Sequence, residues 1–254
     1  MDTTVSDRVQ ITRFDRPEVR NAMTPAVAKE LCDAIEAAID REVRALVLTG
    51  ANGSFCAGGD LEAMAAREET ADDSYRRVQD TLNAIVRGIL SAPFPVIAKV
   101  NGDAVGAGTN LVASCDFAYA TDDARFGEAF VNVGLIPDTG GTVLLPRLVG
   151  LRRAKELTMT GRLFDASTAA EMGLINDAVP DDELDNRVSE LLETLRQKPT
   201  TTLGLIKEGI HGNLGRSVDD GLDHEATLQT RAYGTEAHEE GVTAFLENRQ
   251  PEFR

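Results

Sequence analysis

Two glycine-rich segments, residues 55–61 and 102–110, contain residue types that could stabilise a developing negative charge. Each follows an apolar run typical of a strand and leads into a stretch with helical spacing. Glycines at such junctions let the backbone approach a ligand closely and leave N–H groups free. We therefore predict an oxyanion hole, in which two backbone N–H groups hold one carbonyl oxygen as it becomes negative.

Each segment offers one backbone donor. Gly59 is the expected donor of the first segment because it lies beyond the turn, and Asp60 would cap the helix that follows. A tight turn closed by such a cap explains this segment equally well without any chemistry. The glycine spacing of the second segment fits neither a dinucleotide fingerprint nor a P-loop. It leaves a helix N-terminus whose first N–H groups face a ligand, with Ala107 as the best donor.

The acid–base chemistry points to Asp138, which stands between a proline and a Thr-Gly-Gly turn. Its local sequence fits two interpretations: a helix N-cap, or a general base beside an acyl group. Glu128 follows a Phe-Gly pair and lies either near the site or at a solvated strand end. Asp103 and Asp116 flank the second glycine segment and are interpreted as turn or cap residues.

Nucleophilic and metal chemistry find little support. The histidines are confined to the C-terminal part (His211, His224 and His238), and the chain has no G-x-S-x-G motif. Cys56 lies within the first glycine segment, but without a histidine nearby in sequence it is predicted to be a buried, inert thiol. No spacing typical of metal ligands is present, so no metal site is predicted.

Composition narrows the classes of partner. The chain has 254 residues, 42% of them hydrophobic, and a formal net charge of −16 from 42 acidic and 26 basic residues. A surface this negative argues against nucleic acid or anionic membranes as partners. The three scattered cysteines, with neither a secretory signal nor a membrane span in view, predict a reduced, cytoplasmic protein. The acid excess and scarcity of lysine suggest a halophilic source, although a GC-rich genome would also replace lysine by arginine.

The elements that must position these residues alternate between strand and helix patterns over residues 1–180, which indicates an α/β fold. Strand patterns occupy residues 9–14, 44–50, 95–100, 117–120 and 124–127. Helix patterns occupy residues 24–39, 78–90, 107–115, 140–149, 150–160, 167–173, 181–197, 199–211, 217–231 and 236–248, and residues 62–80 are an exposed helix or loop. We expect an α/β core over residues 1–198 and a helical cap over 199–254.

The glycine segments belong to a series of motifs that extends over nearly the whole chain. The others are RPEVRNAM at 16–23, KVNG at 99–102, SCD at 114–116, FG at 126–127, GLIP at 134–137, GG at 140–141 and EGVTAFLENR at 240–249. Their order and spacing resemble the crotonase superfamily, also called the enoyl-CoA hydratase/isomerase family. The resemblance implies a spiral of ββα units, a C-terminal helical region that forms trimer contacts, and assembly as a homotrimer or a dimer of trimers.

The resemblance also implies a substrate, an acyl-CoA thioester, whose carbonyl would lie between the N–H groups of Gly59 and Ala107. Coenzyme A enters as part of that substrate, and no separate cofactor is implied. Arg20, Ala22 and Ala57 fall where the family holds the CoA moiety. Further substrate contacts are implied at Gly58, Asp60, Leu61, Gly106, Phe130, Gly134 and Pro137.

Departures from the family pattern indicate which reaction to expect. Hydratases of the family carry glutamates at two positions that are Asn110 and Phe130 in this chain. Asp138 falls where the double-bond isomerases carry their acidic base, and residues 129–140 are most similar to the ring-epoxide phenylacetyl-CoA isomerase branch. The resemblance therefore favours an enoyl-CoA isomerase that works through a thioester enolate. The alternatives are a 2-enoyl-CoA hydratase that uses Asp138 or Glu128, and a non-catalytic acyl-CoA-binding subunit.

Overall fold

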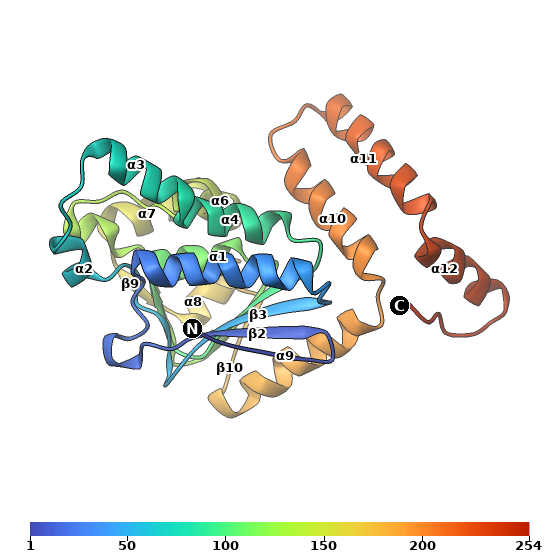
Figure 1. The fold of residues 1–254 in the computed structure, drawn as a ribbon, viewed down its shortest axis with the longest axis horizontal. Coiled ribbons are helices and arrows are strands. Elements are labelled where there is room, and N and C mark those ends of the chain that lie inside the picture. The colour runs from blue at the N-terminus through green and yellow to red at the C-terminus, as the bar shows by residue number, and fades with distance from the viewer. Residues whose placement is uncertain (254) are drawn as a thin grey trace.

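The fold contains two β-sheets, and the larger one has six strands (Figure 1). The computed structural model describes residues 1–253. The six strands of this sheet lie in the order β1 (Asp2–Ser6), β2 (Val9–Phe14), β3 (Ala45–Gly50), β5 (Val96–Val100), β7 (Phe117–Thr121) and β10 (Asp177–Val179). All neighbours are parallel except β1 and β2. Every residue of β3 is buried, as expected of a central parallel strand covered on both faces.

The smaller sheet contains four short strands in the order β4 (Ser54–Cys56), β6 (Asp103–Val105), β8 (Arg125–Gly127) and β9 (Leu163–Asp165). Strands β4, β6 and β8 are parallel, and β9 is antiparallel to β8. The chain alternates between the sheets, so that β3, β5 and β7 of the larger sheet precede β4, β6 and β8 of the smaller one. This alternation is the predicted spiral of ββα units.

The glycine segments follow the long strands β3 and β5 as predicted, but each contains part or all of a short strand that was not predicted. These strands, β4 and β6, have three residues each and are too short to show an alternating pattern. The N-terminal strand β1 was not predicted either, because it is mostly exposed and lacks apolar alternation.

Helices cover both sheets: α1 (Pro25–Asp40), α2 (Leu61–Ala65), α3 (Ala71–Asp80), α4 (Leu82–Ser91), α5 (Ala107–Ser114), α6 (Gly141–Val149), α7 (Leu151–Thr160), α8 (Ala166–Glu171) and α9 (Asp181–Arg196), with 3₁₀ turns η1 (Pro17–Val19) and η2 (Ala129–Val133). Helix α1 starts as predicted, with the Thr24 side chain accepting from the N–H of Val27. The helix expected over residues 78–90 is instead interrupted at Thr81, whose φ of −120° and ψ of −83° are not helical.

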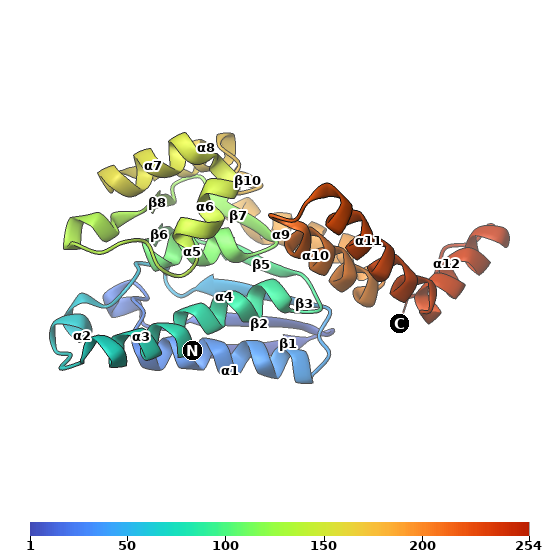
Figure 2. The same ribbon diagram turned by 90° about the horizontal axis from the view of Figure 1, so that it is seen from above.

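Three C-terminal helices extend from the body to one side, as Figures 1 and 2 both show. They are α10 (Thr200–Asn213), α11 (Val218–Tyr233) and α12 (Glu236–Leu246), close to the predicted bounds. The buried ammonium of Lys207 attaches α10 to the core by donating to the carboxylate of Asp116 at 2.6 Å and to the carbonyl of Phe94 at 3.3 Å. Within residues 1–253, no helix combines the length and apolarity needed to cross a bilayer.

Candidate active site

The two glycine segments meet because strands β4 and β6 are parallel neighbours. Cys56 of β4 pairs with Ala104 of β6, so the carboxyl ends of both strands lie at the same edge of the smaller sheet. Ligand sites in open α/β folds form at such edges. Contact between the loops is close: a Cβ placed on Gly58 would lie 3.6 Å from the backbone nitrogen of Ala107 and 2.8 Å from the carbonyl oxygen of Val105. Since Gly58 also has a φ of +90°, glycine is required there.

Within residues 1–253, neither predicted donor uses its backbone N–H in a hydrogen bond. The N–H of Met23 donates to the carbonyl of Gly58 at 2.7 Å, and the N–H of Asp60 donates to the carbonyl of Met23 at 3.0 Å. These bonds flank Gly59 in a parallel bridge, so the Gly59 N–H points to the opposite side. Ala107 is the first residue of α5, whose first-turn N–H groups have no side-chain cap. Two backbone N–H groups at one sheet edge, one of them at a helix N-terminus, are the groups that the predicted oxyanion hole requires.

A cavity of about 460 Å³ opens beside these donors. Gly59, Ala107, Phe130 and Asp138 line it, so the structure brings together four of the residues singled out from the sequence. The remaining lining residues come mainly from α1 and from the segment between α2 and α4: Met23, Thr24, Pro25, Ala28, Met64, Arg67, Glu69, Ser74, Arg77, Val78, Thr81, Leu82 and Leu135.

Asp138 lies in the loop between η2 and α6 and is not the N-cap of a helix. Gly140 occupies the N-cap position of α6, without a side-chain bond, which excludes the cap interpretation. The hydroxyl of Thr139 donates to Oδ1 of Asp138 at 2.8 Å. Burial raises the pKa of Asp138, while the Thr139 hydroxyl and the charge of Arg77 oppose that rise. A carboxylate with a raised pKa beside an oxyanion hole is suited to act as a general base.

Asn110 connects helix α5 to the loop that carries Asp138. It is fully buried, and its Nδ2 donates to the backbone carbonyl of Asp138 at 2.9 Å. Gly141 packs directly on the amide, since a Cβ there would lie 2.4 Å from Nδ2. The side chain at position 110 therefore positions the loop that carries Asp138.

Glu128 is completely buried, which corrects the expectation of a solvated strand end. It follows β8, the strand beside β6, so the topology carries it to the same sheet edge as the glycine segments. Its Oε2 lies 3.5 Å from Nδ2 of Asn110, and the other oxygens, Oε1 of Glu128 and Oδ1 of Asn110, have no hydrogen-bond partner in the described part of the chain. Burial, opposed by the Asn110 bond and aided by the charge of Asp138, raises the pKa of Glu128 to about 8.

Protonation would give Glu128 an O–H donor, the kind of group that the unpaired amide oxygen of Asn110 requires. An acid and an amide can form a ring of two hydrogen bonds, in which the amide N–H donates to one carboxyl oxygen and the carboxyl O–H donates to the amide oxygen. With a pKa of about 8, Glu128 holds that proton at neutral pH. Glu128 does not line the cavity, so its contact is with Asn110 rather than with the space where a substrate would bind.

The residues expected to hold CoA lie together at the first glycine segment. The N–H of Ala57 donates to the carbonyl of Arg20 at 3.0 Å, so the segment containing Arg20 and Ala22 runs alongside it. Asp60 caps α2 by accepting from the N–H of Ala63 and pairs with Arg16 at 3.0 Å. Of the other expected contacts, Gly106 packs near the Phe130 ring, Leu61 begins α2 and is exposed, and Gly134 and Pro137 lie in the loop before Asp138.

Cys56 is fully buried, and burial raises the pKa of its thiol to about 11. The thiolate needed for nucleophilic attack is therefore disfavoured, in agreement with the predicted inert thiol.

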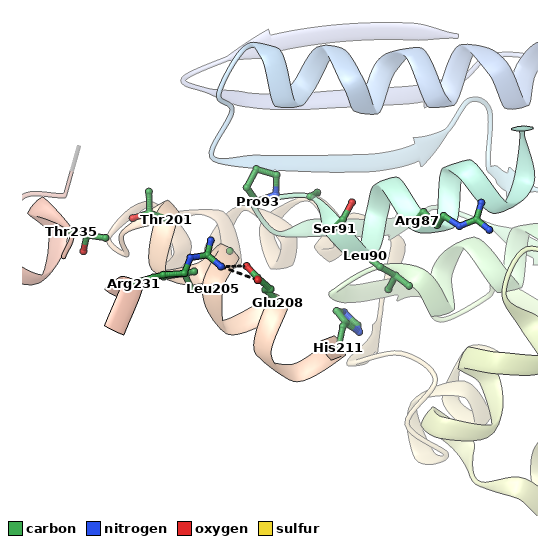
Figure 3. A pocket seen from close by; sticks show the side chains of 12 residues that line it. Arg87, Leu90, Ser91, Pro93, Thr201, Leu205, Glu208, His211, Arg231 and Thr235 are labelled. Atoms are coloured by element: carbon green, nitrogen blue, oxygen red, sulfur yellow. Dashed lines mark hydrogen bonds and ion pairs between the residues drawn. The ribbon is translucent and has the colours of Figure 1, made fainter. Parts of the chain in front are cut away.

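A larger cavity of about 720 Å³ lies between the end of α4 and helices α10 and α11 (Figure 3). Its carboxylate, Glu208, accepts from Nη1 of Arg231 at 2.9 Å with both oxygens. Neither oxyanion donor lines this cavity. The smaller cavity beside Gly59 and Ala107 is therefore the candidate active site.

Comparisons with known proteins find similar sequences and structures over nearly the whole chain. The sequence profile described as enoyl-CoA hydratase/isomerase matches residues 4–254. A probable enoyl-CoA hydratase of Rhodobacter capsulatus is 38% identical, covering 98% of this chain and 95% of that protein. The 1,2-epoxyphenylacetyl-CoA isomerase of Escherichia coli is also 38% identical, covering 98% and 96%. The crystal structure of an enoyl-CoA hydratase from Mycobacterium smegmatis superimposes with a TM-score of 0.92 at 34% identity, covering 99% of this chain and 97% of that one.

Proposed function

The chain belongs to the enoyl-CoA hydratase/isomerase family, and from this premise we propose that it is an enoyl-CoA double-bond isomerase. The observation that carries the proposal is the set of groups that line the cavity at the oxyanion hole. Asp138 is a carboxylate that lines this cavity together with Gly59 and Ala107, while the two positions that carry glutamates in hydratases are an amide, Asn110, and a phenyl ring, Phe130. An isomerase needs one base, because nothing is added from water.

The proposed reaction moves one proton along the acyl chain. The substrate thioester oxygen accepts hydrogen bonds from the N–H groups of Gly59 and Ala107. The Asp138 carboxylate removes a proton from C2 of a 3-enoyl-CoA, and the C–H electron pair moves into the thioester to form a dienolate. Asp138 then returns the proton to C4, which moves the double bond from C3–C4 to C2–C3.

Magnitudes from related chemistry show that these groups suffice. One oxyanion donor contributes about 3–4 kcal/mol to the stability of the transition state. A positioned base adds about 10²- to 10⁴-fold in rate. The raised pKa of Asp138 increases its basicity toward that of the acidified carbon, which favours proton transfer.

A 2-enoyl-CoA hydratase is the second candidate, and a specific observation favours it. Glu128 is a second buried carboxyl group, and the charge of Asp138 helps to raise the pKa of Glu128, so the two carboxyl groups are close enough to interact. Hydration requires one group to activate water and another to protonate carbon. The proposal ranks below isomerisation because Glu128 bonds to Asn110 and does not line the cavity.

A panel of CoA thioesters separates these functions. Wild-type protein is incubated with a 3-enoyl-CoA, a 2-enoyl-CoA and a saturated acyl-CoA, and the products are followed by mass spectrometry and by absorbance of the conjugated thioester. Isomerisation of the 3-enoyl-CoA leaves the mass unchanged and creates the conjugated chromophore. Rapid addition of one water to the 2-enoyl-CoA would instead favour the hydratase. Tight binding without turnover of any thioester would favour a non-catalytic subunit.

The proposal includes assembly as a homotrimer or a dimer of trimers through the C-terminal helices. Large apolar side chains are exposed along them, including Ile206 and Ile210 of α10, Leu222 of α11, and Phe245 of α12, which is 81% exposed. Apolar surface of this extent on extended helices is typical of subunit contacts.

A further inference from the structure

Charged side chains line the candidate acyl cavity, whereas a cavity for a fatty acyl chain would be expected to have an apolar lining. They are Asp138, Arg67, Glu69 and Arg77. Glu69 is already paired: Nε of Arg77 donates to its two oxygens at 2.8 and 3.1 Å, and the Ser74 hydroxyl donates to it at 2.9 Å. The charges of Glu69 and Arg77 therefore compensate each other within the fold.

Arg67 has no such compensation. It lies in the loop between α2 and α3 and is partly buried, and its guanidinium makes no ion pair or hydrogen bond with another side chain of residues 1–253. The acidic groups whose charges it senses are Glu69 and Asp60. Both are occupied, Glu69 by Arg77 and Asp60 by Arg16 at 3.0 Å. A guanidinium with unused donors therefore borders the cavity.

The chemistry of this cation selects among acyl groups. An alkyl chain that reaches Arg67 would remove water from the guanidinium and return no hydrogen bond, which is unfavourable. A carboxylate at the same place would accept two parallel N–H bonds from it. We propose that Arg67 binds a carboxylate on the acyl chain, so that the enzyme acts on CoA thioesters of unsaturated dicarboxylic acids. This inference rests on the proposed isomerase function.

The same donors could bind another anion, a phosphate of CoA. The acyl carboxylate is favoured because Arg67 lines the same cavity as Asp138, the proposed base. Arg20, Ala22 and Ala57, where the family holds CoA, do not line that cavity. Figure 1 shows α2 and α3, the helices that flank Arg67 in the sequence, at the end of the molecule away from the C-terminal helices of the same chain.

The test compares 3-hexenedioyl-CoA with 3-hexenoyl-CoA, which differ by a terminal carboxylate in place of a methyl group. Wild-type protein is expected to prefer the dicarboxylic substrate in kcat/KM by about 10- to 100-fold, the range of a charge-assisted bidentate contact. Arg67→Gln is expected to bring the ratio to about one, and Arg67→Lys to retain part of it. Arg76→Gln is the matched control, because Arg76 is exposed and outside the cavity, and it should keep the wild-type ratio.

Two results would overturn the inference. If the wild-type protein prefers the substrate that ends in a methyl group, Arg67 does not bind an acyl carboxylate. If R67Q loses kcat/KM equally on both substrates, Arg67 contacts the CoA phosphates or supports the fold instead. Calorimetric binding of saturated adipoyl-CoA and hexanoyl-CoA keeps the test independent of turnover. If the protein isomerises neither hexenoyl thioester, the proposed function fails, yet tighter binding of adipoyl-CoA that R67Q abolishes would still support the Arg67 site.

Discussion

Glu128→Gln tests the acid–amide pair behind the candidate base. Glutamine has nearly the shape of a protonated glutamic acid, and its amide can accept from Nδ2 of Asn110 and donate to Oδ1. Unlike the carboxyl group of Glu128, however, the glutamine amide does not gain or lose a proton as the pH changes. We therefore expect E128Q to fold, and to retain isomerase activity within a few-fold of wild type, because Asn110 still holds the carbonyl of Asp138.

The pKa of Glu128 sets how strongly this group makes the free energy of unfolding depend on pH. That pKa rises from 4.5 to about 8 in the folded protein. Between these two values the unfolded chain has released its proton while the folded chain keeps it. Stability from this group is therefore complete below pH 4.5 and is lost as the pH rises through 8. The slope is about 1.4 kcal/mol per pH unit, and the whole window amounts to at most about 5 kcal/mol.

Urea unfolding measured from pH 5 to pH 9 provides the assay. The free energy of unfolding of E128Q should fall less steeply with pH than that of wild type, so that their difference changes in favour of the variant by a few kcal/mol. Glu171→Gln, which removes an exposed glutamate of α8, is the matched control and should run parallel to wild type. Parallel curves for E128Q and wild type would refute the reasoning, since they would mean that Glu128 is ionised in the folded protein.

Three further predictions concern the surroundings of the site and the surface. Asn110→Ala should lower the isomerase kcat by about 10-fold or more and destabilise the fold by about 1–3 kcal/mol, because the Asp138 carbonyl and Glu128 lose a buried partner; unchanged kinetics and urea midpoint would contradict this. The formal charge of −16 predicts a Tm that rises with KCl up to roughly molar concentration, and a flat series by calorimetry would remove the halophilic interpretation. Light scattering should give a trimer or a dimer of trimers of the 27.3 kDa chain, and Ile210→Glu on exposed α10 should dissociate it; a wild-type monomer would contradict the assembly.

Local patterns were sufficient to predict the long elements, and they singled out Gly59 and Ala107, which remain proposed oxyanion donors. Thr24 and Pro25 mark the start of α1, and Gly106 and Ala107 mark the start of α5, because caps and glycine breaks act over a few residues. Asp138 was singled out as a base or a cap; Gly140 occupies the N-cap position of α6, so the cap interpretation is wrong and the role as a base stays a proposal.

Other features depend on contacts that a single sequence does not reveal. The bend at Thr81 interrupts a continuous helical pattern, and the three-residue strand β6 carries no periodicity. Glu128 was missed as a buried group because its burial results from strand β8 lying beside β6. The available signal was its position directly after the Phe-Gly pair, at the edge where the glycine segments also end.

In the proposed reaction, Asp138 alone moves the proton while Gly59 and Ala107 hold the enolate oxygen. The most direct measurement is the rate at which Asp138→Asn converts a 3-enoyl-CoA into the conjugated 2-enoyl-CoA, with binding of a saturated acyl-CoA measured alongside. The amide preserves the shape of the side chain and cannot accept the proton, so kcat should fall by at least about 10²-fold while the saturated thioester still binds. A rate equal to that of wild type would contradict the account.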